Sequence, residues 1–349
     1  QATSPLTLAQ LQQQQAELDQ QSQQLNQQHG ALLALLDDDA QRRHSQQALL
    51  AQRYFGAQLA ARAAQLRERA LAGVREHADA ADGMLRAGVI SELERLQARA
   101  ALADAEQQAR KARDDARLAA TALASTLKAG APVQPTSALF VDSRPLPPLD
   151  TFIDAARQGH PGLAKVQAKR RQAGALLDAQ EALRRPQVLG FGMREINSGG
   201  GKPNWAAGLA VRYTLWDSVD RDRLAASAQR KIEQAELTEQ QALADIALLV
   251  EKNWLAVDQA RTQYLAQQAQ EELARELLRL RAAALRGGTG TALELIDAEL
   301  NLARVQTERA QTAHQYVQAL AALLESTGQA GEFERYMAQA DIQITPSTP

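Results

Sequence analysis

The stretches RAGVISELERLQARAALA (residues 86–103) and RGGTGTALELIDAELNLA (residues 286–303) are two versions of one sequence, placed 200 residues apart. The same offset aligns Tyr54 with Trp254. Similarity at a fixed offset indicates one structural unit that is used twice. We predict that the unit is a pair of long helices joined by a tight turn. Seven of the 18 aligned positions are identical: Arg86/Arg286, Gly88/Gly288, Leu93/Leu293, Glu94/Glu294, Ala98/Ala298, Leu102/Leu302 and Ala103/Ala303.

Each version carries signals for the end of one helix and the start of the next. Gly88 and Gly288 stand where a glycine in the left-handed conformation commonly ends a helix. The sequences SELE (91–94) and TALE (291–294) then match the capping box that begins a helix. Two capping boxes at equivalent places predict two sharp helical hairpins.

The composition is typical of long helices and coiled coils rather than of a compact enzyme. Aromatic residues make up 4% of the 349 residues, and 41 acidic residues nearly balance 39 basic ones, which argues against nucleic-acid binding. The chain has no cysteine, which excludes disulfides and thiolate metal sites. Its five histidines lack metal-ligand spacing, and neither GGGKP (199–203) nor RGGTGT (286–291) has the context of a phosphate or dinucleotide motif. We expect no catalysis, no cofactor and no metal.

These signals divide the chain into four parts and predict a mainly α fold of long antiparallel helical hairpins with one β-hairpin. The parts are 1–129, a first repeat that forms a helical hairpin without a β-hairpin; 130–162, a proline-rich linker and equatorial segment; 163–328, a second repeat with a β-hairpin at 186–217 and a helical hairpin at 218–327; and 329–349, a C-terminal tail that we expect to fray.

The N-terminal region gives two expectations. Residues 6–28 are rich in glutamine with recurring leucines, which predicts either a solvated helix or the wall of a water-filled duct. The chain starts at Gln1 without an apolar signal-type stretch, which we interpret as a mature exported chain, although a trimmed chain looks the same.

Period-two alternation sets residues 186–217 apart from the helical remainder. The arms of about ten residues have the length that crosses a bilayer in a barrel, and aromatic residues near the strand ends suit the membrane interfaces. An ordinary hairpin with one buried face is the alternative. The predicted membrane-hairpin residues are Leu189, Phe191, Met193, Trp205, Leu209, Val211, Tyr213 and Leu215.

The second half resembles the TolC-like outer-membrane efflux ducts. The resemblance is carried by WAAGLAVRYTLWD (205–217), VEKNWLAV (250–257) and RGGTGTALELIDAE (286–299). It implies a homotrimer in which helices form a hollow α-helical barrel in the periplasm and β-hairpins form a shared β-barrel in the outer membrane of a Gram-negative bacterium, in contact with its lipid. It also implies a passive exit channel for efflux or secretion, which docks to a periplasmic adaptor and an inner-membrane pump.

The first half departs from that family's pattern. LAQLQ (8–12) aligns with LAKVQ (163–167) at an offset of 155, whereas the later offset is 200, so about 45 residues are absent between roughly Gly30 and Asp39. A first β-hairpin is expected there. Three copies would then supply six strands, and known single-chain barrels start at about eight. A non-conducting periplasmic coiled-coil scaffold, derived from the same family, is therefore the alternative function.

The resemblance also assigns site residues. The family's acidic pore constriction falls on Glu294 and Asp297, where carboxylate rings would favour cations and close the pore. The alternative is that Glu294 only caps its helix and Asp297 is solvated. The family's gate arginine falls on Gly290, so that contact is expected to be missing. The adaptor-contacting tip, for which simple turn chemistry is the alternative, comprises Arg86, Gly88, Val89, Ile90, Ser91, Arg286, Gly288, Thr289 and Thr291.

Overall fold

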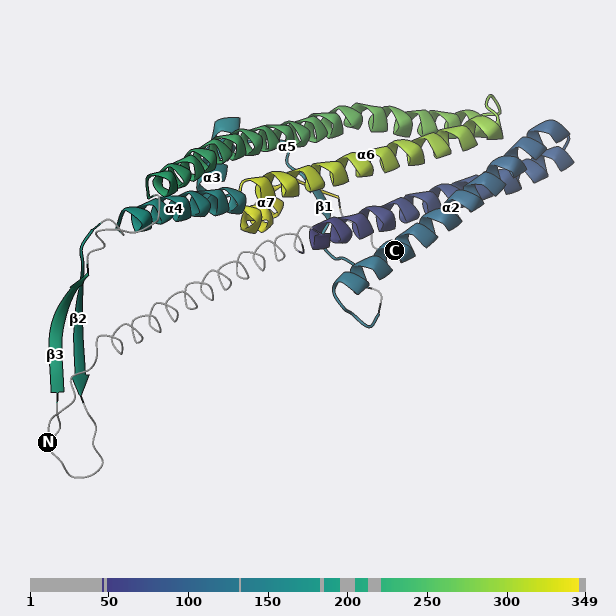
Figure 1. Cartoon of the computed structure of the whole chain (residues 1–349). Coiled ribbons are helices and arrows are strands. Elements are labelled where there is room, and N and C mark those ends of the chain that lie inside the picture. The colour runs from purple at the N-terminus through teal and green to yellow at the C-terminus, as the bar shows by residue number, and fades with distance from the viewer. Residues whose placement is uncertain are drawn as a thin grey trace, which may run out of the picture. The chain divides into compact units, whose positions relative to one another are not determined.

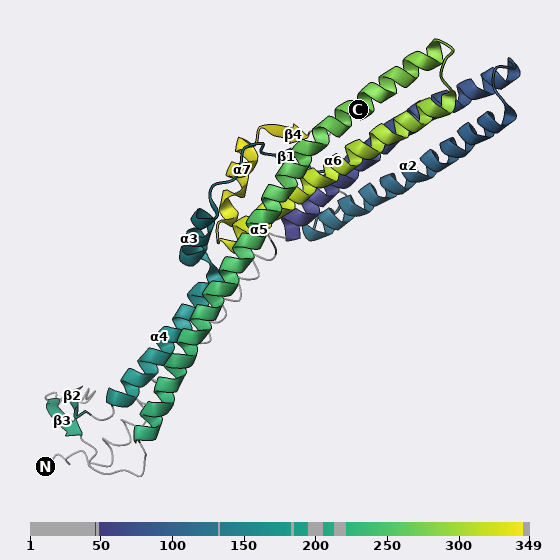
Figure 2. The same cartoon turned by 90° about the horizontal axis from the view of Figure 1, so that it is seen from above.

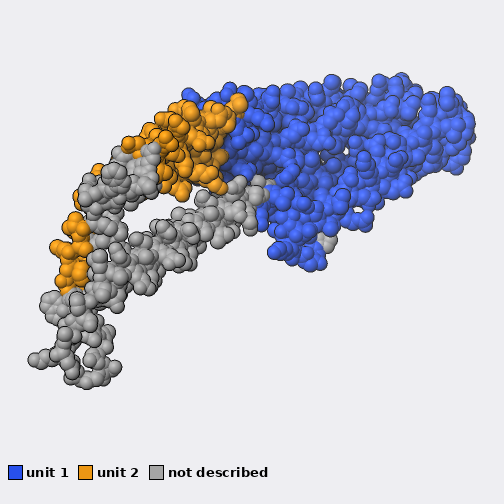
Figure 3. All heavy atoms as spheres, in the orientation of Figure 1, with its two compact units in different colours: residues 1–158, 249–349 blue, residues 159–248 orange. Residues whose placement is uncertain are grey.

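The computed structural model describes residues 46, 49–131, 133–182, 185–194, 205–212 and 221–344. Long helices dominate these residues, and the strands are few and short (Figure 1), so the predicted mainly α fold class is confirmed. The chain forms two compact units (Figure 3): unit 1 contains Gln1–Gln158 and Leu249–Pro349, and unit 2 contains Gly159–Leu248. Each unit differs from the predicted repeats, because unit 1 combines residues from both of them. The division of the sequence into four parts stays a prediction.

Unit 1 contains two helical hairpins of matching dimensions. The first joins a helix over residues 49–86 to α2 (Glu92–Thr126), and the second joins the end of α5 (Arg221–Arg286) to α6 (Ala292–Ser326). α2 and α6 both have 35 residues, and their bounds differ by 200. Both connecting turns lie at the same end of the unit (Figures 1 and 2). The repeat in the sequence is therefore a repeat of structure.

Small buried residues pack the first hairpin against α6. They recur every three or four residues along each helix, which places them on one face. Many are alanines, so the helix axes can approach closely while the interior stays densely packed. The cluster consists of Leu71, Val74, Ala78, Ala81, Ala98, Leu102, Ala105, Ala109, Ala292 and Ile296.

A two-stranded sheet and an aromatic cluster join the linker to the C-terminal region. β1 (Leu139–Val141) pairs antiparallel with β4 (Ile342–Ile344). Phe140 of β1 is fully buried and makes edge-to-face contacts with Phe55, Tyr316 and Phe333, at ring-centroid distances of 5.8–6.2 Å. Such pairs add to the free energy gained from burial alone.

The prediction that the tail frays after Gly328 is wrong for residues 329–344. A short 3₁₀ turn η1 (Ala330–Glu332), α7 (Phe333–Gln339) and β4 occupy this segment. Asp341 accepts hydrogen bonds from the backbone N of Ser143 at 2.8 Å and from its hydroxyl at 2.6 Å. Pairing with a strand about 200 residues earlier therefore holds the tail in place.

The repeat-related residues Tyr54 and Trp254 both hold the proline-rich linker. Tyr54 Oη accepts hydrogen bonds from Thr136 N at 3.1 Å and from Ser137 N at 2.8 Å, and Trp254 Nε1 donates to Pro147 O at 3.0 Å. These bonds satisfy backbone groups that proline-rich chain cannot pair in a helix or sheet. The helix α3 (Leu149–Gly159) follows the linker.

Unit 2 contains α4 (Pro161–Ala182), the first part of α5, and a β-ribbon. Pro161 suits the first helical position because that residue needs no backbone donor. An ion pair joins Arg170 of α4 to Glu239 of α5 at 2.9 Å. In the part of the chain that the structure describes, no helix combines the length and apolar character needed to span a bilayer.

The described side chains of the β-ribbon are apolar or small on both faces. β2 (Gln187–Arg194) pairs antiparallel with β3 (Trp205–Arg212), in a register that sets Gly190 opposite Leu209 and Phe191 opposite Gly208. Opposed residues share a face and successive residues alternate, so Leu209 and Phe191 lie on different faces. None of the residues with described side chains is polar: Val188, Gly190, Phe191, Gly192, Ala207, Gly208, Leu209, Ala210 and Val211.

Several of the predicted membrane-hairpin residues have no described side chain. Leu189, Met193 and Trp205 are strand residues, of which only the backbone is described. Tyr213, Leu215 and the turn over 195–204 lie outside the described residues, as do the glutamine-rich stretch and the place of the missing first hairpin.

Candidate functional site

The two tips end their first helices in the same way. Gly88 and Gly288 both have φ 72°, a left-handed conformation that glycine adopts without a steric penalty. The backbone bonds around them form the Schellman arrangement, which satisfies carbonyls left free at a helix end. They run from Gly88 N to Leu85 O and Val89 N to Met84 O in the first tip, and from Gly288 N to Leu285 O and Thr289 N to Ala284 O in the second, all at 2.9–3.1 Å.

Both predicted capping boxes are present. Ser91 Oγ accepts from Glu94 N at 3.3 Å, and Glu94 Oε2 accepts from Ser91 N at 2.7 Å. Thr291 and Glu294 make the same two bonds, each at 3.2 Å. The bond from the Ser91 backbone holds the pKa of the Glu94 carboxyl below its usual value.

Most predicted tip residues are exposed, and the first tip is the more apolar one. Arg86, Gly88, Val89 and Ser91 are exposed, and so are their counterparts in the second tip, whereas Ile90 is half-buried against the core cluster.

Two leucines that are absent from the predicted tip extend its apolar surface. Val89 is 71% exposed, and the first turns of α2 add Leu93 at 65% and Leu96 at 52%. We call Val89, Leu93 and Leu96 the first-tip patch. The sequence could have revealed these two leucines, because they lie three positions apart directly after an exposed turn.

The two predicted constriction residues differ in their surroundings. Glu294 caps α6 and also pairs with Arg281 of α5, at 3.0 Å between Oε1 and Nη1. Asp297 is exposed and has no hydrogen bond or ion pair with any described residue. Arg281 is absent from the predicted site, although it lies about as far before the turn as Glu294 lies after it. The roles of Glu294 and Asp297 in a pore stay predictions.

Gly290, where the resemblance places the family's gate arginine, has little room for a side chain. A Cβ atom at this position would lie 3.0 Å from the Ala284 Cβ and 3.1 Å from the Leu285 N. These contacts are tighter than ordinary van der Waals distances, so a larger residue would displace the end of α5.

The first tip has ion pairs that the second tip lacks among the described residues. Arg99 of α2 bonds Asp82 and lies 3.4 Å from Asp79, and Arg95 lies 3.7 Å from Asp82. The hydrogen bond from Arg99 is the main reason that the pKa of Asp82 lies below its usual value. These pairs are partly exposed to solvent, so each is expected to contribute little to stability.

The two outermost helices of unit 1 both expose leucines. α5 and α2 form the two edges of the helical layer (Figures 1 and 2). On α5, Leu273 is 71% exposed, and Leu277 and Leu280 follow at helical spacing on the same face. On α2, Leu93 and Leu118 are 25 residues apart, close to seven whole turns, and both are exposed. The exposed apolar line on α5 is of the kind that marks a contact surface.

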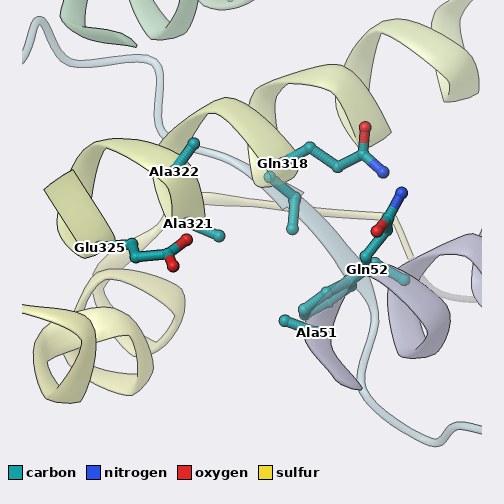
Figure 4. Close-up of a pocket in the computed structure, with 8 residues that line it drawn as sticks. Ala51, Gln52, Gln318, Ala321, Ala322 and Glu325 are labelled. Atoms are coloured by element: carbon teal, nitrogen blue, oxygen red, sulfur yellow. The ribbon is translucent and has the colours of Figure 1, made fainter. Parts of the chain in front are cut away.

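The described residues show no catalytic or metal-binding cluster. No group of three or more His, Asp or Glu side chains in them could hold a metal ion. Figure 4 shows a cavity of about 250 Å³ between the start of the helix over 49–86 and the end of α6. Its lining is mostly apolar or amide, with Glu325 as the one titratable group: Ala51, Gln52, Phe55, Val317, Gln318, Ala321, Ala322 and Glu325.

The sequence and the fold of this chain are similar to those of known proteins. The family model described as outer membrane efflux protein matches residues 152–329, which is just over half of the chain. The chain belongs to the outer membrane efflux protein family. The matched residues contain α6, the second tip and the β-ribbon, so the predicted resemblance is confirmed.

Solved structures of outer-membrane proteins share the fold of this outer membrane efflux protein. A membrane protein from Pseudomonas aeruginosa aligns with a TM-score of 0.63 and 18% identity over 85% of this chain and 70% of its own. The CmeC outer membrane channel of Campylobacter jejuni gives 0.62 and 17% over 85% and 66%. The open-state MtrE outer membrane channel of Neisseria gonorrhoeae gives 0.63 and 20% over 84% and 69%.

The outer membrane efflux protein spans about two thirds of the length of these structures. No curated protein sequence matches it significantly. Family members are channels of the outer membrane, so the chain is a transport protein and not an enzyme. Its location is the outer membrane and periplasm of a Gram-negative bacterium.

Proposed function

We propose that the chain is one protomer of an efflux or secretion duct, a passive exit channel that spans the periplasm in a tripartite export system. The observation that carries the proposal is the pair of matched hairpins with both tips at one end of unit 1. Helices of this length bury their apolar faces only against other long helices. Copies of the layer around a common axis would provide such neighbours and enclose a hollow.

The edge leucines support a homotrimer. In a ring, α5 of one copy would lie beside α2 of the next, and Leu273, Leu277 and Leu280 would pack against that helix. A contact between two different edges is heterologous, and such contacts close into a ring when the rotation fits. Three copies are the number that the family uses.

The first-tip patch supports docking to a periplasmic adaptor, which would connect the duct to an inner-membrane pump. Val89, Leu93 and Leu96 present apolar surface at the end of the hairpins, where a partner's helices would gain free energy by covering it. The polar tip residues Arg286, Thr289 and Thr291 would form the hydrogen-bonding rim of the contact.

The acidic residues of the second tip would form the constriction. Repeated by the trimer, Glu294 and Asp297 give two stacked rings of carboxylates, which favour cations. In each copy the Arg281–Glu294 ion pair ties one ring to α5. The closed state would then depend on these pairs and on cations shared between copies.

The β-ribbon would contact the lipid of the outer membrane. Val188, Leu209 and Val211 are exposed on one face, and Phe191 is exposed on the other. Transfer of this surface from water to hydrocarbon is favourable.

The same ribbon favours a second candidate, a non-conducting coiled-coil scaffold of the periplasm. Conducting outer-membrane barrels pair an apolar outer face with a polar inner face, and the described side chains of this ribbon offer apolar or small residues on both faces. A scaffold would use the helical layer and the tips to bind partners and would need no lumen.

Planar-bilayer recording of the full chain tests the proposal. A duct gives discrete conductance steps, and Glu294→Gln with Asp297→Asn gives larger steps with weaker cation preference, because two carboxylates per copy are neutralised. Glutamine keeps the capping box at position 294.

Glu94→Gln is the matched control, since it changes the same capping position in the other repeat, and its conductance should equal that of the parent chain. A chain that inserts into the bilayer but conducts no ions contradicts the duct and supports the scaffold.

A further inference from the structure

A second cavity of unit 1 is lined by arginines from both helical hairpins. It has a volume of about 420 Å³ and lies among the helix over 49–86, α5, α6 and β4. Its size falls in the range of roughly 300–1,000 Å³ that small-ligand sites occupy. The lining consists of Arg62, Tyr264, Glu271, Arg275, Gln306, Arg309, Ala310, Ile342, Gln343 and Ile344.

Both oxygens of the one carboxylate in the lining already accept hydrogen bonds from the protein. Glu271 is 7% exposed, and its Oε1 accepts from Arg275 at 2.5 Å and from Gln306 at 3.0 Å. Its Oε2 accepts from Arg309 at 2.5 Å. Three arginines and a single acidic residue line the cavity, so guanidinium donors outnumber carboxylates there.

Two of the arginines are held in partly desolvated positions. The Arg309 guanidinium stacks on Tyr264, with its Cζ 4.4 Å from the ring centroid, and its buried Nε has no hydrogen-bond partner among the described residues. Burial, together with the charge of Arg69, lowers the pKa of Arg62. A buried donor without a partner points to a group that the protein itself does not supply.

We propose that this cavity binds a small polyvalent oxyanion from solution, of the class of inorganic phosphate or a tricarboxylate. A guanidinium presents donors in a planar fork that matches carboxylate and phosphate oxygens. Arg62 comes from the first helical hairpin, and Arg275 and Arg309 come from the second. A bound anion therefore bridges the two hairpins and stabilises their packing. The site is separate from the tips and does not depend on conduction.

Titration calorimetry of the full chain tests the site, with inorganic phosphate and citrate as probes in chloride buffers of matched ionic strength. We expect saturable binding of at least one probe, and a melting temperature that rises with its concentration because the ligand binds the folded chain. Arg62→Gln should weaken binding by at least about tenfold, the usual loss for a hydrogen bond to a charged group.

Two further variants keep the test decisive. Arg275→Gln changes a largely exposed side chain of the lining, so it should fold and also bind more weakly. Arg304→Gln is the control, since this arginine of α6 pairs with Glu308 and does not line the cavity. Absence of saturable binding by both probes, or equal affinity in Arg62→Gln and Arg304→Gln, would overturn the proposal.

Discussion

Gly88 and Gly288 fix where each helical hairpin reverses its direction. Both residues have φ 72°, and the same two backbone bonds surround them. At the other end of each repeat, Gly328 has φ 72° while its counterpart Lys128 takes φ 54°. A lysine in this region carries a steric cost that glycine avoids. Both repeats therefore have glycine in the left-handed position at the tip, whereas at the opposite end only the second repeat does.

The second tip offers a clean comparison between neighbouring glycines. Gly288→Ala should lower the free energy of unfolding by about 1–2 kcal/mol, because a Cβ atom disfavours the left-handed conformation. Gly287 has no positive φ, and a Cβ there would meet Ala283 O at an ordinary 3.5 Å. Gly287→Ala should therefore cost no such penalty. Urea denaturation measures both, and equal losses would contradict the role given to Gly288.

At the scale of elements, a buried ionic network locks α5 against α6. Burial acts to raise the pKa of Glu271, but hydrogen bonds from Arg309 and Gln306 and the charges of Arg275 and Arg309 outweigh it, so the pKa lies below the usual value of 4.5. A carboxyl whose pKa falls on folding stabilises the fold above its unfolded pKa. That contribution is lost as the pH falls through the lower, folded pKa.

Removal of this carboxylate should change how stability depends on pH. Glu271→Gln should cost about 3 kcal/mol near neutral pH, because two arginines lose their partner. It should also flatten the loss of stability that is expected of the parent chain as the pH falls through the lowered pKa of Glu271.

Denaturation midpoints across this pH range provide the measurement. Glu272→Gln, the exposed neighbour that accepts a bond from Gln268, serves as the control and should keep the parent's pH profile. An unchanged profile in Glu271→Gln would show that the network carries no pH-dependent stability.

The features that the sequence predicts are those with local signals. Turn glycines and capping boxes act within a few residues, so the sequence alone locates both tips. β4 has three residues and pairs with β1 some 200 positions earlier, so no local pattern reveals it, and the sequence alone predicts a frayed tail. Similarly, the cavity around Glu271 gathers residues from three helices and a strand, which only the packing of the hairpins brings together.

The β-ribbon shows how register decides the chemistry of a face. Alternation in each strand is visible in the sequence, but the pairing of Gly190 with Leu209 sets Phe191 of β2 and Leu209 of β3 on opposite faces. A shift by one residue would gather them on one face. Alternation within each strand therefore does not determine which side chains share a face of the ribbon. The register between the strands decides this, and no local sequence pattern specifies it.

At the scale of the whole molecule, the helical layer requires neighbours. The layer of unit 1 ends in α5 on one side and α2 on the other, and both edges expose leucines to solvent in the single chain. Burial of each such side chain contributes roughly 1.5–3 kcal/mol. The central claim is that three copies bury these edges against one another around a shared axis.

Site-directed cross-linking tests that claim most directly, because the chain has no cysteine of its own. Leu96→Cys on α2 with Leu280→Cys on α5 places one thiol on each edge at a similar distance from the tips. After treatment of the full chain with a short bis-maleimide, a trimer of this kind predicts covalent species up to the trimer in denaturing gels. Leu96→Cys with Leu249→Cys, an exposed leucine on another face of α5, should stay monomeric. Equal cross-linking of the two pairs, or a chain that stays monomeric in both, would contradict the claim.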